Sequence, residues 1–187
     1  PERLSRVFKE LDGRVKVAIA GTGIQNWGQQ LTAQYSQLYA TDLGADAVDL
    51  GLLNSMAAAF SSIMSAPLGW AAEKYTVRKV MLLGFALIAL SAAISASAGT
   101  WLMLIPAFLI GARLVRIMPL TDIVFITATK PEHRATVMAL SRVVWGILNI
   151  FAPMTAALVV AEFGGINARG IRPLYYVQLI LTVFAFL

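Results

Sequence analysis

The chain has 187 residues, with 58% hydrophobic side chains, 13% charged side chains and a formal net charge of +5. Soluble domains carry about 25% charged residues, so this composition argues against a soluble globule and favours a membrane protein. Cysteine is absent, which excludes disulfides, thiolate metal sites and cysteine nucleophiles.

Residues 1–13 are expected to form an amphipathic segment on the cytoplasmic surface of the membrane. Leu4, Val7, Phe8 and Leu11 recur at helical spacing between charged residues. This pattern is typical of a short helix that lies in the membrane interface. The segment lacks the short apolar core and the small-residue cleavage site of a signal peptide, so we expect no removable leader.

Residues 14–187 are expected to form one bundle of six membrane-spanning helices. Such a helix needs about 20 predominantly apolar residues. Six apolar runs follow one another with short links, at residues 15–38, 48–70, 78–98, 101–128, 136–161 and 172–187. The predicted fold class is therefore an all-α membrane protein, and the chain leaves no length for a separate soluble domain.

The basic residues of the links lie mainly on one side of this bundle. The N-terminal segment, the second link and the fourth link contain ten of them: Arg3, Arg6, Lys9, Arg14, Lys16, Lys74, Arg78, Lys79, Lys130 and Arg134. The opposite side has Arg169 and Arg172, and its first link contains Asp42, Asp46 and Asp49. Lys and Arg near span ends favour the cytoplasmic side. We therefore expect a multi-pass protein of the plasma or inner membrane with both termini in the cytoplasm. Because the positive charges follow the links rather than one basic face, no nucleic-acid partner is expected.

The first apolar run contains a dense series of amide side chains. They are Gln25, Asn26, Gln29 and Gln30. An amide without a partner in hydrocarbon costs several kcal/mol, so lipid is an unsuitable neighbour for them. We expect these side chains to line a polar cavity and to contact substrate, while packing onto another helix is the alternative. Gly21 and Gly23 do not form a dinucleotide-binding loop, because no strand precedes them and a third glycine is missing.

The second run carries small side chains along one helix face. They are Gly51, Ser55, Ala58, Ser62, Ser65 and Gly69. Lipid supplies no hydrophobic force between helices, and small residues permit the close approach that holds helices together in a bilayer. We expect another helix to pack on this face.

A charged turn joins the second and third runs and carries a family motif. Its residues are Gly69, Glu73, Lys74, Arg78 and Lys79. They resemble the signature loop of the major facilitator superfamily, in which a glycine, three residues, an acid, a base, one residue and a second glycine precede basic residues. Thr76 stands at the second glycine, Val77 takes the first basic place, and Glu73 replaces the usual aspartate. The resemblance implies a cytoplasmic gate or structural charge cluster.

Asp122 and Arg142 are expected to belong to the same gating or structural charge cluster. They lie before and after the turn at Pro131, at similar depths in the predicted antiparallel pair of helices. We expect a buried ion pair between them, although Arg142 has Glu73 as an alternative partner.

Two arginines, Arg113 and Arg116, lie near the centre of the fourth run. An arginine at mid-membrane costs roughly 2.5–3.5 kcal/mol on insertion scales and usually marks a functional site. The two residues are three apart and share a helix face. Their guanidinium groups suit an anionic substrate held by bidentate hydrogen bonds. The alternative is a structural role, with acids of other helices neutralising both charges.

The resemblance to the major facilitator superfamily covers nearly the whole chain and includes Pro119 and the loop at residues 131–135. It implies the N-terminal half of a secondary transporter, built of two inverted three-helix repeats that move against a second six-helix half around a midplane site. That half would be a C-terminal part of the protein, a partner chain or a second copy. The expected partners are the lipid bilayer, this second half and a small solute, for which the arginine pair favours an anionic character.

No residue pattern indicates an enzyme, a cofactor or a metal site. His133 is the only histidine, and no nucleophile, base and orienting group occur at recognisable spacing. Two functions from other classes stay open: a scaffold or assembly subunit of a membrane complex, and a channel. Sealed packing faces would favour the scaffold, whereas a continuous polar path through one bundle would favour the channel.

Overall fold

The computed structural model describes residues 13–111, 129, 131 and 134–186, and this part of the chain is all-α. Its seven α-helices are α2 (Gly13–Ala33), α3 (Ser36–Asp42), α4 (Ala47–Lys74), α5 (Val77–Ser97), α6 (Leu104–Ile110), α9 (Arg134–Glu162) and α10 (Ala168–Phe186). A short 3₁₀ helix, Trp101–Met103, precedes α6. The predicted amphipathic segment at residues 1–13 lies, except for Gly13, outside the described residues.

Three helices of the described part are long and apolar enough to cross a membrane. They cover Ala47–Ala71, Lys79–Ser97 and Arg134–Glu162, and they coincide with the second, third and fifth predicted runs. The amides of α2, and Arg169, Arg172 and Gln178 of α10, lower the apolar content of those two helices. The fourth run is described only as far as Gly111.

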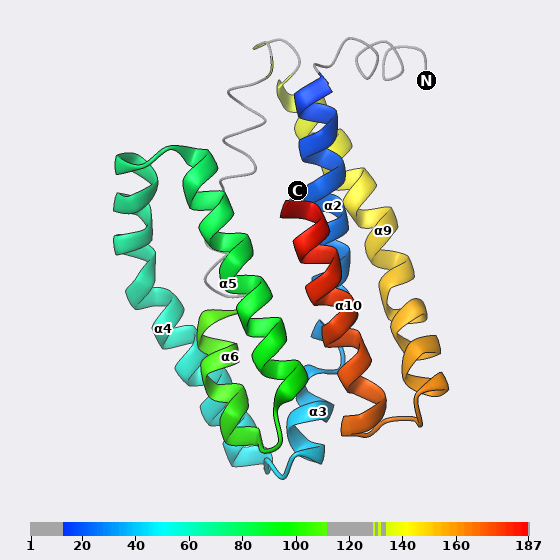
Figure 1. Ribbon diagram of the computed structural model, residues 1–187. Coiled ribbons are helices and arrows are strands. Elements are labelled where there is room, and N and C mark those ends of the chain that lie inside the picture. The colour runs from blue at the N-terminus through cyan, green and yellow to red at the C-terminus, as the bar shows by residue number, and fades with distance from the viewer. Residues whose placement is uncertain (1–12, 112–128, 130, 132–133, 187) are drawn as a thin grey trace.

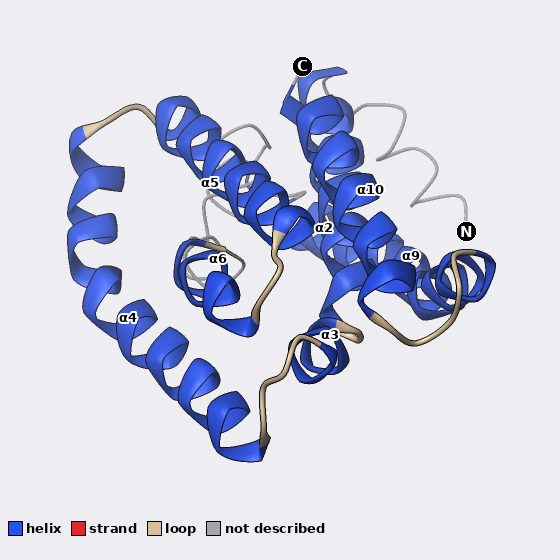
Figure 2. Cartoon of the chain, turned by 60° about the horizontal axis from the view of Figure 1, so that its bottom comes forward, coloured by secondary structure: helices blue, strands red, loops and turns tan. Residues whose placement is uncertain are grey.

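The helices form a row in which α10 and α2 lie near the middle (Figures 1 and 2). α10 packs against α2, α5 and α9, while α2 also packs against α9. On the other side, α6 packs between α5 and α4, and α4 forms the outer flank. The last two helices, α9 and α10, thus pack against the first long helix, α2, so that the core joins segments far apart in sequence.

The links between helices gather at two ends of the bundle. The α3–α4, α5–α6 and α9–α10 links lie at the lower end in Figure 1, together with α3 itself, and we call this the α3 end. The α4–α5 link lies at the opposite end. The predicted first, third and fifth links therefore share one end, as an alternating path of spans requires.

The first predicted run is not one continuous helix. α2 ends at Ala33, a turn follows in which the Tyr35 amide donates to the Thr32 carbonyl at 3.1 Å, and α3 begins at Ser36. The break reorients the chain so that Tyr39 of α3 is completely buried. The prediction of a single helix over 15–38 was wrong here, because apolar content alone does not register a change of helix direction.

Glycines of α2 permit close contacts with α9 and α10. A Cβ atom built on Gly23 would lie 3.3 Å from Cδ1 of Trp145 in α9, and one built on Gly28 would lie 3.3 Å from Cδ1 of Leu181 in α10. These two residues lie on α2 faces that meet different neighbours. Small residues that allow close approach are the principal packing device in a bilayer, and α2 uses them to fit between α9 and α10.

The small-residue face of α4 is exposed in this chain rather than packed. Gly51, Ser55, Ala58, Ser62, Ser65 and Gly69 are all exposed, and no atom lies within 4 Å of a Cβ built on Gly51 or Gly69. No described helix packs on this face, so the expected contact with another helix stays a prediction. The residues that α4 buries are Leu53 and Ala57, and its main contact is with the short α6.

Replacing Gly28 with leucine is expected to destabilise the bundle, because the new side chain must displace Leu181. Overpacking of this kind costs about 1–3 kcal/mol. The matched control is Gly146→Leu in α9, where nothing lies within 4 Å of an added Cβ. Both changes gain the same helix propensity, so thermal unfolding of the purified protein in detergent isolates the packing effect. Equal unfolding temperatures for the two variants would contradict the close α2–α10 contact.

Candidate functional site

The amide series of α2 divides between helix packing and a cavity. Asn26 donates from Nδ2 to Oδ1 of Asn149 in α9 at 3.2 Å, so this side chain joins two helices. Gln30 is half-buried. Gln25 is buried, with 8% of its surface exposed, and its Nε2 has no hydrogen-bond partner among the described residues. The two expectations for the series, packing and cavity lining, thus apply to different members.

Gln29 faces a cavity of about 280 Å³ between α2, α3, α4, α5, α6 and α10, which we call the polar cavity. Its polar lining residues are Gln29, Thr32, Ser36, Gln37, Asn54, Ser91, Ser95 and Gln178. Ile88, Phe108 and Tyr175 complete the wall with apolar surface. No charged side chain belongs to the lining within the described part of the chain, so the cavity is polar without being electrostatically biased.

A hydrogen bond between α2 and α10 forms one wall of the polar cavity. The Thr32 hydroxyl donates to Oε1 of Gln178 at 2.9 Å, with a second contact to the Gln29 carbonyl at 3.0 Å. Thr32 is 6% exposed and Gln178 is 7% exposed. On the opposite wall, the Ser91 hydroxyl of α5 donates to the Ala107 carbonyl of α6 at 2.8 Å. These bonds hold the polar side chains in fixed orientations at the cavity surface.

Below the polar cavity, a buried polar junction ties α3, α5 and α10 together. The Tyr39 hydroxyl donates to the Ser95 carbonyl at 2.8 Å and accepts from Nε of Arg172 at 3.3 Å. A terminal nitrogen of Arg172 donates to the Ala98 carbonyl at 2.6 Å. The Tyr39 ring also packs on Tyr175, with 5.2 Å between centroids. Carbonyls at the end of a helix lack intrahelical partners and favour a positive charge, so the junction caps α5.

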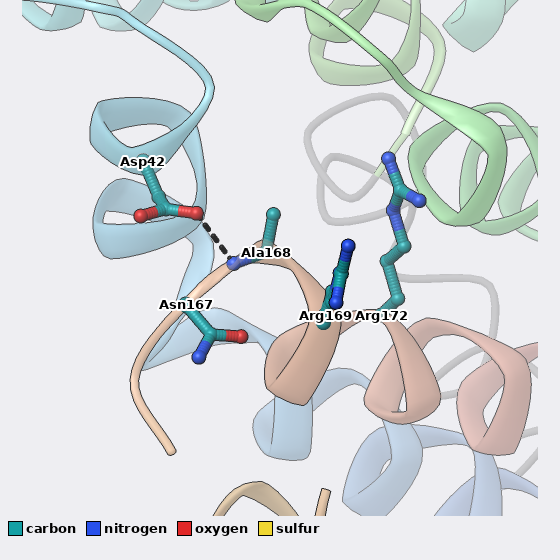
Figure 3. A pocket seen from close by; sticks show the side chains of 5 residues that line it. All are labelled: Asp42, Asn167, Ala168, Arg169 and Arg172. Atoms are coloured by element: carbon teal, nitrogen blue, oxygen red, sulfur yellow. Dashed lines mark hydrogen bonds between the residues drawn. The ribbon is translucent and has the colours of Figure 1, made fainter. Parts of the chain in front are cut away.

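A second, more open cavity of about 420 Å³ lies at the α3 end, lined by Asp42, Asn167, Ala168, Arg169 and Arg172 (Figure 3). Asp42 accepts from the backbone amide of Ala168 at 2.6 Å, and Asn167 accepts from that of Gly170 at 2.8 Å. Two side chains therefore satisfy the first amides of α10. Arg172 belongs to the buried junction, whereas Arg169 is exposed.

The predicted charge cluster surrounds the short α4–α5 turn. Only Tyr75 and Thr76 separate the two helices. Thr76 adopts φ −61° and ψ 135°, an extended conformation open to any residue, so the turn does not need the glycine of the family signature. Glu73 and Lys79 are exposed, and Nζ of Lys74 lies 4.5 Å from the centre of the Trp70 ring. A gating role for these residues stays a prediction.

Several predicted site residues fall outside the described part of the chain: Arg113, Arg116 and Asp122. Arg142 is described and lies exposed on α9, and the side chain of Arg78 is not described. Their roles therefore stay predictions. The sequence reasoning did not single out Thr32, Tyr39 or Gln178. Polar residues within apolar helices, at Thr32 and Gln178, were the available signal.

The described fold consists of apolar helices whose mainly apolar interior contains a few buried polar side chains. The comparison with protein families assigns this fold. The family model of the Major Facilitator Superfamily matches residues 18–187. The chain belongs to the major facilitator superfamily. This family consists of membrane transporters rather than enzymes, which confirms the expected resemblance and the non-enzymatic function. Comparisons with curated proteins and with solved structures give no significant match.

Membership of the major facilitator superfamily makes the chain part of a secondary transporter in a membrane. It does not indicate the substrate. Within the described residues, no group of three acidic or histidine side chains is placed to hold a metal ion.

Proposed function

We propose that the chain forms the N-terminal six-helix half of a secondary transporter that moves a small solute by alternating access. The family match over residues 18–187 carries this proposal. In this proposal the six passes are, in chain order, α2 with α3, α4, α5, the segment that begins with α6, α9 and α10. Grouped by three, these passes would form the two inverted repeats that such transporters use.

The second half of the transporter would cover the outer faces of α4 and α9. Exposed apolar side chains include Leu52, Met56 and Ile63 on α4 and Ile147, Ile150 and Met154 on α9. In a bilayer, lipid or another helix must meet this surface. The small-residue face of α4 admits close helix contact, and a C-terminal part of the protein, a partner chain or a second copy would supply the opposing helices.

The α3 end is proposed to face the outside of the cell, and the α4–α5 turn to face the cytoplasm. Ten basic residues of the links and N-terminal segment are predicted on the cytoplasmic side, against Arg169 and Arg172 on the other. This asymmetry favours the orientation. The protein would then lie in the plasma or inner membrane with both termini in the cytoplasm.

Single cysteines at the two ends of α4 test this orientation, because the native chain contains no cysteine. Val48 and Tyr75 are suitable positions, since both are exposed. The side chains that cap the start of α4 are those of Asp46 and Asp49, so neither substitution removes a cap. In intact cells, a membrane-impermeant maleimide is expected to label Val48→Cys and not Tyr75→Cys, and permeabilisation exposes both. Labelling of Tyr75→Cys alone in intact cells would reverse the proposed topology.

The charge cluster around the α4–α5 turn is proposed to stabilise one transport state from the cytoplasmic side. Glu73, Lys74 and Lys79 are exposed at that end and can reach charged helix ends of the second half. Arg142 on α9 and Asp122 are proposed as further members. An exposed ion pair contributes little by itself, but several such pairs that form in one state and break in the other can shift the balance between states.

Arg113 and Arg116 are proposed to hold an anionic group of the solute. The support is their mid-span position and shared helix face in the sequence, and the high cost of an unpaired arginine in the membrane. Bidentate hydrogen bonds from a guanidinium group suit carboxylate and phosphate oxygens.

Exchange of Arg113 for lysine is expected to weaken binding of the anionic solute by about 1–3 kcal/mol, because the charge remains but the planar fork is lost. Arg113→Gln is expected to weaken it more. Binding of a panel of small organic anions to the purified protein is the measurement, with exposed Arg169→Lys at the α3 end as the matched control. Wild-type affinity of Arg113→Gln for every anion that binds would contradict a substrate role.

A further inference from the structure

The polar cavity contains hydrogen-bonding groups that the fold itself leaves unused. Nε2 of Gln29 is buried and has no partner among the described residues. Gln178 is 7% exposed. Its Oε1 accepts from the Thr32 hydroxyl, and its backbone carbonyl accepts from the Thr182 hydroxyl. Its Nε2 donors are therefore not used by the described chain. Both glutamines line the cavity.

Acceptors accompany these donors on the cavity wall. Asn54 uses Nδ2 to donate to the Leu50 carbonyl at 2.9 Å, which leaves Oδ1 for another partner. Buried polar groups almost always have a hydrogen-bond partner, and leaving one without a partner incurs its full desolvation penalty. The unused groups therefore point to an occupant that both donates and accepts hydrogen bonds.

The chemistry of the lining defines the class of occupant. Hydroxyls and amides surround the cavity, and its described lining residues carry no charge. An ion placed there would lose its hydration without gaining a counter-charge, which is costly. A hydroxyl group donates one hydrogen bond and accepts others, so it suits amide donors and carbonyl acceptors at once.

The size of the cavity limits the occupant to a small molecule. A volume of about 280 Å³ corresponds to roughly nine water molecules at about 30 Å³ each. It lies at the lower limit of known ligand pockets. The apolar faces of Phe108 and Tyr175 in the wall provide surface for the carbon skeleton of such a molecule.

We propose that the polar cavity between α2, α5 and α10 binds a small uncharged polyol through Gln29, Thr32, Asn54 and Gln178. This inference names an uncharged solute class, as a rival to the anionic solute that the arginine pair favours, and it rests on the proposed transport function only for the claim that the bound molecule is carried. The proposal uses none of the residues outside the described part of the chain, such as Arg113 and Arg116. Binding and transport can therefore be tested separately.

Equilibrium binding of radiolabelled uncharged polyols, from glycerol to glucose, to the purified protein in detergent tests the site. Gluconate serves as the charged counterpart of glucose. At least one neutral polyol is expected to bind saturably, with gluconate binding more weakly at this site. Thr32→Val removes a hydroxyl while keeping the side-chain shape, and is expected to weaken polyol binding roughly three- to tenfold, because the Gln178 carbonyl loses its orienting donor.

Gln178→Leu removes both the donors and the acceptor, and is expected to weaken binding tenfold or more. The matched control is Thr155→Val, since Thr155 lies half-buried on α9, outside the cavity lining, and its hydroxyl bonds only carbonyls of its own helix. Thermal unfolding in parallel identifies a variant that fails to fold. If Gln178→Leu does so, the shape-conserving Thr32→Val decides the question.

Three outcomes overturn the inference: no saturable binding of any polyol, equal affinity in wild type and the folded Thr32→Val variant, or tighter binding of gluconate that depends on Arg113. The last result would support the anionic solute proposed above and reject the neutral site. Polyol binding that needs Thr32 but leads to no transport would support the site and reject its transport role.

Discussion

The close fit of α2 between α9 and α10 is the contact on which the rest of the bundle depends. Gly23 admits Trp145 on one face and Gly28 admits Leu181 on another. Lipid tails are as apolar as the helix surfaces, so the hydrophobic effect does not drive helices together in a bilayer. Close packing contacts of this kind supply the attraction instead. It also brings Thr32 within 2.9 Å of Gln178. The packing of α2 thereby creates the wall of the polar cavity.

The buried junction at Tyr39 and Arg172 determines where this cavity ends. The hydroxyl and the guanidinium satisfy carbonyls of Ser95 and Ala98 at the end of α5. Because α3 carries Tyr39 and α10 carries Arg172, the three helices are held together by bonds that a bilayer would not supply. The polar cavity adjoins this junction, since Ser95 and Tyr175 line the cavity and also contact Tyr39.

The sequence predicted the helical class and the family, because apolar length and a short loop motif are local properties. The cytoplasmic side of the links stays a prediction from loop charge. The sequence did not predict the break at Tyr35 or the glycine contacts of α2, since both depend on which helices become neighbours. Gly23 was considered only as part of a dinucleotide loop, and the helix expected on the small face of α4 was not identified. Gln29, one of the amides expected at a cavity or a helix contact, lines the polar cavity. Gln178, which bonds Thr32 in the same wall, lies in α10, far away in sequence.

Solute counterflow tests the central claim of alternating access most directly. Proteoliposomes that contain the assembled transporter, purified through a tag on this chain, are loaded with unlabelled solute identified by the binding experiments and diluted into a trace of labelled solute. A carrier is expected to accumulate label transiently above equilibrium, and Glu73→Gln is expected to reduce this overshoot by disturbing the balance between states. Flux that reaches equilibrium without an overshoot would identify a channel, and no solute-dependent flux at all would contradict a transport function.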